Sequence, residues 1–192
     1  MQLATLQRNI RKIYNLAQPQ HITQGKIWYK QANQFCQELA DQYNIDLAQV
    51  VGCLAVLSPN CSWETNKKAC TDMLALGHCP NSNVYPDNVA KAYSIVYEGR
   101  NPVDVLGNPN RYGNKVRAFY DNILHPECSE AVTVDTHAIR AALGRYEVTR
   151  NELRKVFETK SGYLRLQEAY TKVARSLDLL PCELQAIVWL SV

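Results

Sequence analysis

Apolar residues recur at steps of three and four along most of the chain, the spacing that places them on one face of a helix. Prolines and glycines separate these stretches, as they do at helix ends. The stretches lie at about residues 3–17, 28–43, 47–57, 63–76, 87–98, 115–124 and 132–143, with further ones that begin near 149, 163 and 181. The pattern contains no alternation long enough for a strand. We therefore predict an all-α fold of about nine helices.

Two features of the pattern organise this fold. Residues 47–57 (LAQVVGCLAVL) are apolar around most of the helix circumference, which is typical of a helix at the centre of a core. Residues 101–113 are polar and contain prolines and glycines, so we predict a loop there. We expect one helical domain over residues 1–192 that divides into two lobes with a cleft, residues 1–45 with 145–192 and residues 46–144.

Composition and charge exclude several classes of protein. The chain has 192 residues, of which 46% are hydrophobic, so it can bury a core and is too apolar to be disordered. No apolar stretch approaches the roughly 18 residues of a membrane span, and the first residues lack the apolar segment of a signal peptide. We expect a cytoplasmic protein that does not enter a membrane. The net charge of +3 is compatible with a nucleic-acid partner but does not require one.

Seven cysteines are distributed over the chain. Cys53, Cys61, Cys70 and Cys79 follow one another at spacings of 8, 9 and 9 residues, whereas zinc-binding cysteines usually come in pairs two to four residues apart. The close four-cysteine run of an iron–sulfur site is also missing from the sequence. We interpret these cysteines as small core residues, and we expect neither a metal nor a cofactor.

The most informative stretch is VTVDTHAIR, residues 132–140. Asp135 follows a short β-branched run and precedes a helix, where its carboxylate can cap free backbone N–H groups. The same position suits a carboxylate that faces a cleft and acts on a substrate, so both interpretations stay open. His137 lies two residues further on, and a single histidine is more often structural than catalytic.

VDTHAIR resembles the segment that supplies the catalytic aspartate in the helix-hairpin-helix DNA glycosylases of the endonuclease III and 8-oxoguanine glycosylase superfamily. Gly113–Val116 is similar to the Gly-x-Lys segment that carries the nucleophilic lysine of the bifunctional members. Lys115 precedes Asp135 by 20 residues, close to the separation in that superfamily.

Two further stretches agree with this resemblance. Leu57–Asn60, followed by Asn66–Ala69, looks like the leucine-serine turn and the helix that line the cleft of these glycosylases. The C-terminal LPCELQAIVWL resembles their last barrel helix. The landmarks run from about residue 50 to 190 in the order expected for the superfamily, which implies a helical fold with two lobes.

The resemblance implies an enzyme that cleaves the N-glycosidic bond of a flipped base in double-stranded DNA, with lyase activity if the lysine is the nucleophile. Asp135 would stabilise an oxocarbenium-like sugar, and Lys115 would attack C1′ and form a Schiff base. The residues implied to contact the substrate are Ser58, Asn60, Trp63, Tyr112 and His137. The residues implied to contact DNA are Gly107, Arg111, Gly113, Asn114, Arg117 and Arg140.

Three alternatives remain at this stage. Leu106–Gly113 is longer and more polar than the tight Leu-Pro-Gly-x-Gly hairpin of the superfamily. Counted forward from Ser58, Lys115 instead matches a helix start of the superfamily and is then not a nucleophile. The second alternative is a non-catalytic nucleic-acid-binding or regulatory protein on the same scaffold. The third is a protein-interaction domain in which Asp135 is only a cap.

Residues 100–175 contain 13 basic and 9 acidic side chains, against 8 and 7 in residues 1–99. This excess favours a nucleic-acid partner for the later part of the chain.

Overall fold

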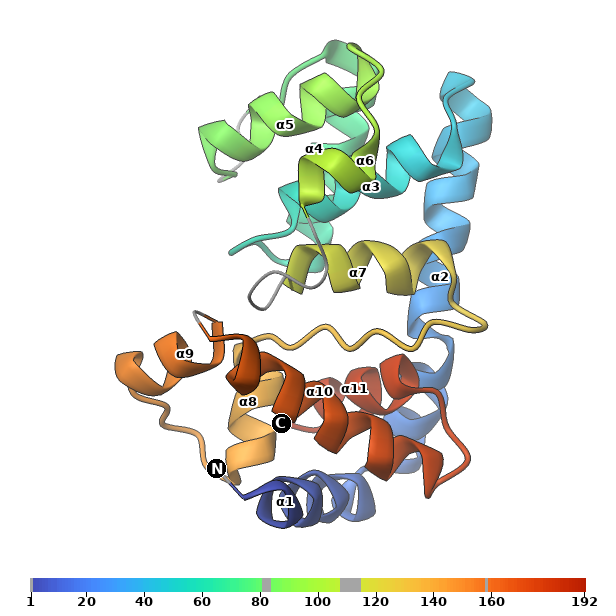
Figure 1. The fold of residues 1–192 in the computed structure, drawn as a ribbon. Coiled ribbons are helices and arrows are strands. Elements are labelled where there is room, and N and C mark those ends of the chain that lie inside the picture. Colours follow the sequence, from blue (N-terminus) through green and yellow to red (C-terminus); the bar gives the residue numbers. More distant parts are fainter. Residues whose placement is uncertain (1, 81–83, 108–114, 158) are drawn as a thin grey trace. The chain divides into compact units, whose positions relative to one another are not determined.

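The computed structural model describes residues 2–80, 84–107, 115–157 and 159–192 (Figure 1). Over these residues the chain folds into eleven helices and contains no strand. The helices are α1 (Leu3–Leu16), α2 (Pro19–Tyr43), α3 (Leu47–Leu57), α4 (Trp63–Leu76), α5 (Pro86–Val96), α6 (Pro102–Leu106), α7 (Lys115–Leu124), α8 (Thr136–Leu143), α9 (Arg150–Phe157), α10 (Lys160–Arg175) and α11 (Pro181–Leu190). The predicted all-α fold is confirmed, and the expected number of helices was too low.

One helix that the pattern does not predict is α6, which lies where a loop is expected. Asn101 caps it, because its side-chain oxygen accepts a hydrogen bond from Val103 N at 2.9 Å, and Pro102 occupies the first helical position. A helix of 5 residues is too short to show an apolar stripe, so only this cap and proline could have indicated it. Helix α5 begins at Pro86, one residue before the stretch expected from the pattern, and Tyr85 is its N-cap.

The chain divides into two compact units. Unit 1 comprises Met1–Gln31 and Pro109–Val192, and unit 2 comprises Ala32–Asn108. Helix α2 contributes its first part to unit 1 and its second part to unit 2. The division expected from the sequence placed residues 109–144 with residues 46–108, whereas here they belong with the two ends of the chain. The reason is that α8 packs against α1, α10 and α11.

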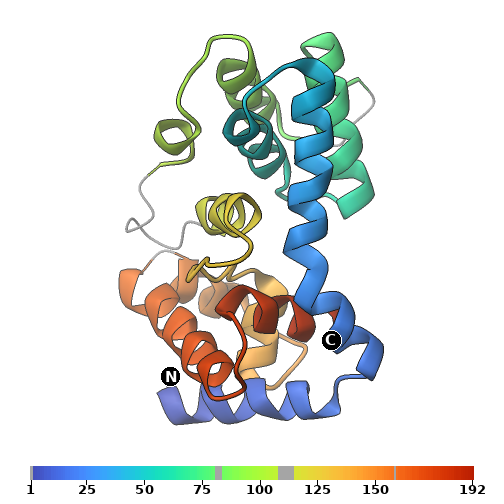
Figure 2. The same ribbon diagram turned by 90° about the vertical axis from the view of Figure 1, so that its right-hand side faces the viewer.

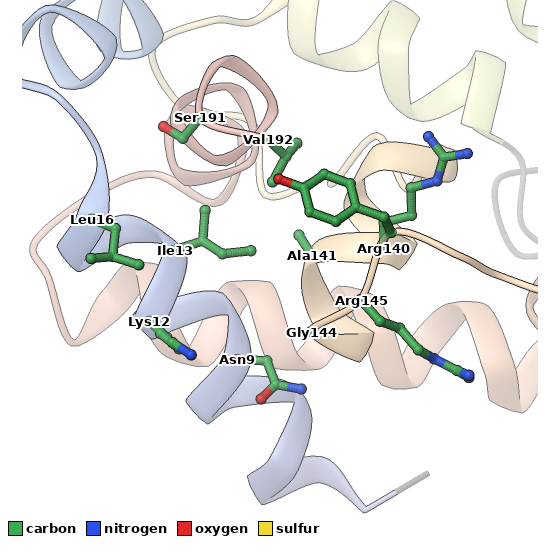
Figure 3. Close-up of a pocket in the computed structure, with 11 residues that line it drawn as sticks. Asn9, Lys12, Ile13, Leu16, Arg140, Ala141, Gly144, Arg145, Ser191 and Val192 are labelled. Carbon is green, nitrogen blue, oxygen red and sulfur yellow. The ribbon is translucent and has the colours of Figure 1, made fainter.

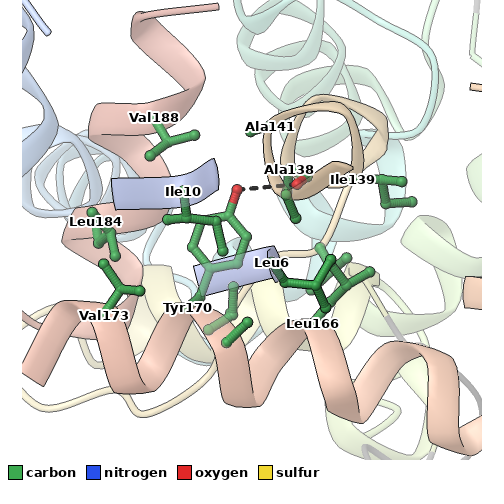
Figure 4. Packing of buried hydrophobic residues seen from close by; sticks show 14 of the residues in the cluster. Leu6, Ile10, Ala138, Ile139, Ala141, Leu166, Tyr170, Val173, Leu184 and Val188 are labelled. Carbon is green, nitrogen blue, oxygen red and sulfur yellow. Dashed lines mark hydrogen bonds between the residues drawn. The ribbon is translucent and has the colours of Figure 1, made fainter. Parts of the chain in front are cut away.

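The core of unit 1 is built around α1, α8, α10 and α11. Helix α1 lies against the other three, as Figures 1 and 2 show, and buries Leu6 and Ile10 among them. Tyr170 of α10 is fully buried in this core, and its hydroxyl donates a hydrogen bond to Ala138 O of α8 at 3.1 Å (Figure 4). A buried hydroxyl with a partner avoids the cost of an unsatisfied polar group, so this bond ties α10 to α8 within an otherwise apolar contact.

The core of unit 2 is built around α3. Residues Val50–Leu57 of this helix are all buried, and it packs against α4, α5 and α6. Asp46 caps the helix by accepting a hydrogen bond from Ala48 N at 2.8 Å. The approach of α6 is close, because a Cβ added to Gly52 would lie 2.7 Å from the Pro102 side chain. The prediction that residues 47–57 form a central core helix is therefore confirmed.

Of the four cysteines predicted to be core residues, Cys53 and Cys70 are buried, whereas Cys61 and Cys79 are only half-buried. Of the other three, Cys36 and Cys182 are buried and Cys128 is exposed. All seven are free thiols. In the described part of the chain, no group of three or more potential ligands is placed to hold a metal ion. No described helix is both long enough and apolar enough to cross a membrane.

Candidate functional site

The candidate site begins with an extended segment, residues 130–134, that leads into α8 (Figure 1). Val132, Thr133 and Val134 are buried in unit 1. Because β-branched side chains favour extended backbone, the local sequence suits this conformation. The segment therefore carries the chain through the core and delivers Asp135 to the start of α8.

Tyr163 of α10 holds the backbone of this segment. Its hydroxyl donates to Val132 O at 2.9 Å and accepts from Val134 N at 3.3 Å. Asp135 N in turn donates to Thr133 O at 3.0 Å. An extended segment without a neighbouring strand would otherwise leave buried backbone groups unpaired. The Tyr163 hydroxyl thus makes the hydrogen bonds that the backbone of a neighbouring strand makes in a sheet.

A buried polar network fixes the same segment through the Thr133 side chain. Tyr29 Oη of α2 lies 3.1 Å from Thr133 Oγ1 and 2.7 Å from Gln185 Oε1 of α11. Asn122 Nδ2 of α7 donates to Thr133 Oγ1 at 3.1 Å, and Ser129 Oγ donates to Asn122 Oδ1 at 2.6 Å. All five side chains are buried. The network thus links α2, α7 and α11 to the segment that positions Asp135.

Asp135 is the N-cap of α8 and is half-buried. Its Oδ1 accepts a hydrogen bond from Ala138 N at 2.7 Å. Among the described residues, Oδ2 has no hydrogen-bond partner. The N-terminal end of a helix also stabilises a negative charge. The carboxylate is consequently held at the start of α8 through Oδ1.

The charge of this carboxylate acts on the pKa values of three buried tyrosines. Burial raises the pKa values of Tyr29, Tyr163 and Tyr170 well above their ordinary value, and the negative charge of Asp135 raises all three further. These phenols keep their protons at neutral pH. Tyr29 and Tyr163 thus keep their hydrogen bonds to the segment, and Tyr170 keeps its bond to Ala138 O of α8.

The other described residues of unit 1 that the sequence pointed to have varied surroundings. Lys115 is the first residue of α7 and is half-buried, and His137 is exposed on α8. Arg117 Nε bonds to Asp121 Oδ1 at 2.9 Å, and its guanidinium carbon lies 5.6 Å from the Tyr120 ring centre. Arg117 is thus engaged within α7.

Arg140 lies in the last turn of α8 and lines a pocket. The other expected DNA-contacting and substrate-contacting residues of unit 1 are Arg111, Tyr112, Gly113 and Asn114, and they lie outside the described residues.

Four of the expected site residues belong to unit 2. Ser58 ends α3, with its Oγ donating to Ala55 O at 2.8 Å, and Gly107 ends α6 with a φ of +81°. Asn60 has a left-handed backbone, with a φ of 59°, and its amide bonds to the Tyr85 hydroxyl. The fourth residue, Trp63, has aromatic and cationic neighbours.

Trp63 begins α4 and packs edge-on against Phe35, with ring centres 6.2 Å apart. Lys67 Nζ lies 5.6 Å from the Trp63 ring centre and 5.9 Å from that of Phe35. A cation over two aromatic rings stabilises this cluster within unit 2.

Sequence reasoning missed the side chains that position Asp135. Asn122 and Gln185 are polar residues at buried positions of helices whose neighbouring residues are apolar. Buried polar groups need partners, so this placement was the available signal. Tyr163 offered no comparable signal, because a tyrosine on the apolar face of an amphipathic helix is ordinary.

The two units carry opposite net charges. Unit 1 contains 17 basic and 10 acidic residues, a net charge of +7, whereas unit 2 contains 4 and 8, a net charge of −4. Residues 1–31 contribute five basic residues and no acidic one. The positive charge of the chain is therefore concentrated in the unit that holds Asp135.

Comparison with known proteins gives one kind of match. A family model matches residues 1–192, and its description is a family of unknown function, DUF7178. No curated protein and no solved structure matches the chain.

Proposed function

The chain belongs to DUF7178, a family of unknown function, and we propose that it acts on DNA as a glycosylase-like enzyme that cleaves the N-glycosidic bond of a flipped base. The proposal starts from the resemblance of VDTHAIR, at residues 134–140, to the aspartate segment of helix-hairpin-helix glycosylases. It is supported by the placement of Asp135 and by the positive charge of unit 1.

The observation that carries the proposal is how Asp135 is held. A residue that served only as a cap would need a single hydrogen bond to the helix, which Oδ1 makes with Ala138 N. Here the preceding backbone is additionally fixed by Tyr163 and by the network around Thr133. The backbone that leads to Asp135 is thus fixed, which suits a carboxylate that has to meet a reacting atom in one geometry.

The chemistry follows from this arrangement. Loss of a base leaves positive charge on the sugar, and a fixed carboxylate stabilises that charge more than mobile water does. The target base has to leave the helical stack before it reaches Asp135. Lys115, at the start of α7, is the nucleophile of the accompanying lyase step. Its neutral amine attacks C1′ as the C1′–base bond breaks and the base leaves with a proton. The C1′–O4′ bond then breaks to give a Schiff base, from which the 3′ phosphate leaves by β-elimination.

A second candidate function is a nucleic-acid-binding or regulatory protein without catalysis. The charge of unit 1 favours it, because a net charge of +7 attracts a polyanion whether or not any bond is broken. The two functions differ in one observable, the release of a free base.

The test is base release from duplexes that each carry one modified or mismatched base. Asp135→Asn keeps an N-cap of nearly equal quality, so it removes the charge while leaving the fold intact. We expect it to abolish release. The matched control is Asp178→Asn, an exposed aspartate of unit 1 whose φ of 55° suits asparagine. Release that survives in Asp135→Asn, or an inactive wild type that still binds DNA, rejects the glycosylase proposal.

The lyase step has a separate test. Borohydride reduces a Schiff base and links enzyme to DNA covalently, so we expect trapping by the wild type and its loss in Lys115→Ala. Lys26→Ala, another lysine of unit 1, serves as the control. Full trapping and full base release by Lys115→Ala would contradict its assignment as nucleophile.

A further inference from the structure

A basic surface lies at the end of α8 opposite to Asp135. It is formed by Arg8 and Lys12 of α1, both exposed, and by Arg140 and Arg145 at the C-terminal end of α8. Arg8 and Lys12 are four residues apart and share one face of α1. Lys12, Arg140 and Arg145 line the same pocket of 250 Å³. We call these four residues the α1–α8 basic surface.

The pocket itself has an apolar floor and a charged rim. Its floor includes Ile13 of α1 and Ala141 of α8, and none of the described residues that line it is acidic. Figure 3 shows Lys12 on one side and the two arginines on the other, with the guanidinium groups of Arg140 and Arg145 directed away from the floor. Cations on the rim suit an extended anion that passes over the surface more than a small anion enclosed within it.

These cations are largely available to a ligand. Within the described part of the chain, Arg8, Lys12 and Arg140 take part in no ion pair, whereas Arg145 pairs with Glu152. Both side chains of that pair are substantially exposed, and exposed pairs contribute little, so a phosphate can compete with Glu152 for Arg145.

The packing of α1 decides between a nucleic acid and a membrane. A basic amphipathic helix binds anionic lipid through its apolar face. In unit 1 this face is already covered, because Leu6 and Ile10 are buried in the core. Leu16, at the C-terminal end of α1, remains exposed, but one apolar side chain gives the helix little surface for insertion into lipid. The exposed charge of α1 therefore favours a hydrated polyanion.

We infer that the α1–α8 basic surface binds the phosphate backbone of a nucleic acid. The inference rests on the proposed function for its partner but requires no chemistry at Asp135. Helix α8 has 8 residues, which span about 12 Å at 1.5 Å per residue. That length corresponds to roughly three to four base pairs along a duplex. One duplex can therefore contact both ends of α8.

The experiment measures duplex binding by fluorescence anisotropy as a function of salt. The variant is the double substitution Arg8→Gln with Lys12→Gln, and the matched control is Lys68→Gln with Lys91→Gln, two exposed lysines of unit 2. Each lost phosphate contact lowers the log–log salt slope by about 0.9. Between about 50 and 200 mM salt, the wild type then loses about twelvefold more affinity than the variant. The control should keep the wild-type slope.

Three results would overturn the inference. One is a variant whose affinity and salt slope equal those of the wild type, and another is an equal loss in the unit 2 control. The third is a wild type that binds phosphatidylserine vesicles but no duplex. Failure here is distinguishable from failure of the proposed function: base release with unchanged binding by the variant refutes only this surface, whereas reduced binding by the variant without base release refutes only the catalysis.

Discussion

Removal of the Tyr163 hydroxyl is the most direct test of how the Asp135 segment is held. Tyr163 is almost fully buried, and its hydroxyl serves two backbone groups, Val132 O at 2.9 Å and Val134 N at 3.3 Å. Phenylalanine keeps the ring and its packing. The substitution Tyr163→Phe therefore leaves a buried acceptor and a buried donor without a partner.

The expected cost follows from these two groups. A buried polar group that loses its partner costs about 1–3 kcal/mol, and the weaker 3.3 Å contact lies at the low end of that range. We expect Tyr163→Phe to lower the free energy of unfolding by about 2–4 kcal/mol. Since a domain is typically stable by about 5–15 kcal/mol, the loss is easily measured.

The measurement is urea unfolding followed by far-ultraviolet circular dichroism, with an m-value that stays at the wild-type level. Tyr170→Phe is the matched control, because its hydroxyl donates to Ala138 O at 3.1 Å. This carbonyl also accepts a backbone hydrogen bond within α8, so it keeps one partner when the hydroxyl is removed. That variant should lose only about 0.5–1.5 kcal/mol. A cost for Tyr163→Phe below about 0.5 kcal/mol, or below that of Tyr170→Phe, would refute the view that Tyr163 replaces a sheet ladder.

Three further predictions address packing, pH and thiol access. Gly25→Ala should destabilise by about 1–3 kcal/mol in urea unfolding despite alanine's better helix propensity, because its Cβ would lie 2.4–2.7 Å from atoms of Ile187; a stabilised variant would contradict this close approach. Hydrogen bonds from the Thr149 backbone and hydroxyl lower the pKa of Glu152 from 4.5, so its stabilisation is present above that pH and is lost as the pH falls through the lower folded-state pKa. The difference in urea midpoint between wild type and Glu152→Gln should therefore be constant near neutrality and shrink in acid, and a difference that grows there would show the opposite sign. Iodoacetamide should label Cys128 first, because the side chain is exposed while four other thiols are buried; mass spectrometry of Cys128→Ser should show that the fast label is gone.

Local patterns were sufficient for most of the helices and for the position of Asp135 before α8, although α2 begins at Pro19 rather than near residue 28. A stripe of apolar residues is visible in any long amphipathic helix, and an acid before THAIR indicates an N-cap without knowledge of the rest of the fold. The same reasoning failed for α6, since one turn of helix has no period to detect. The central position of α3 could be predicted because its apolar character extends around the whole helix.

The partners of the Asp135 segment could not be predicted, because they depend on contacts between distant parts of the chain. The Tyr29 hydroxyl meets Thr133 across 104 residues and Gln185 across 156. No window of sequence contains both ends of such a contact. The polar character of Asn122 and Gln185 predicts that each needs a buried partner, but only the packing of α7 and α11 determines which one.

The charge distribution shows the same dependence on topology, and it bears most directly on function. Divided by sequence position, the later part of the chain is only slightly more basic than the earlier part. The fold instead joins residues 1–31, which hold no acidic residue, to residues 109–192, through contacts such as Asn9 Nδ2 to Ala142 O across 133 residues. The acidic residues of the intervening segment are thereby gathered in unit 2, leaving +7 on unit 1. A chain whose total charge is only +3 can thus contain a strongly basic unit. Local charge rather than the total determines electrostatic attraction within a Debye length of about 8–10 Å.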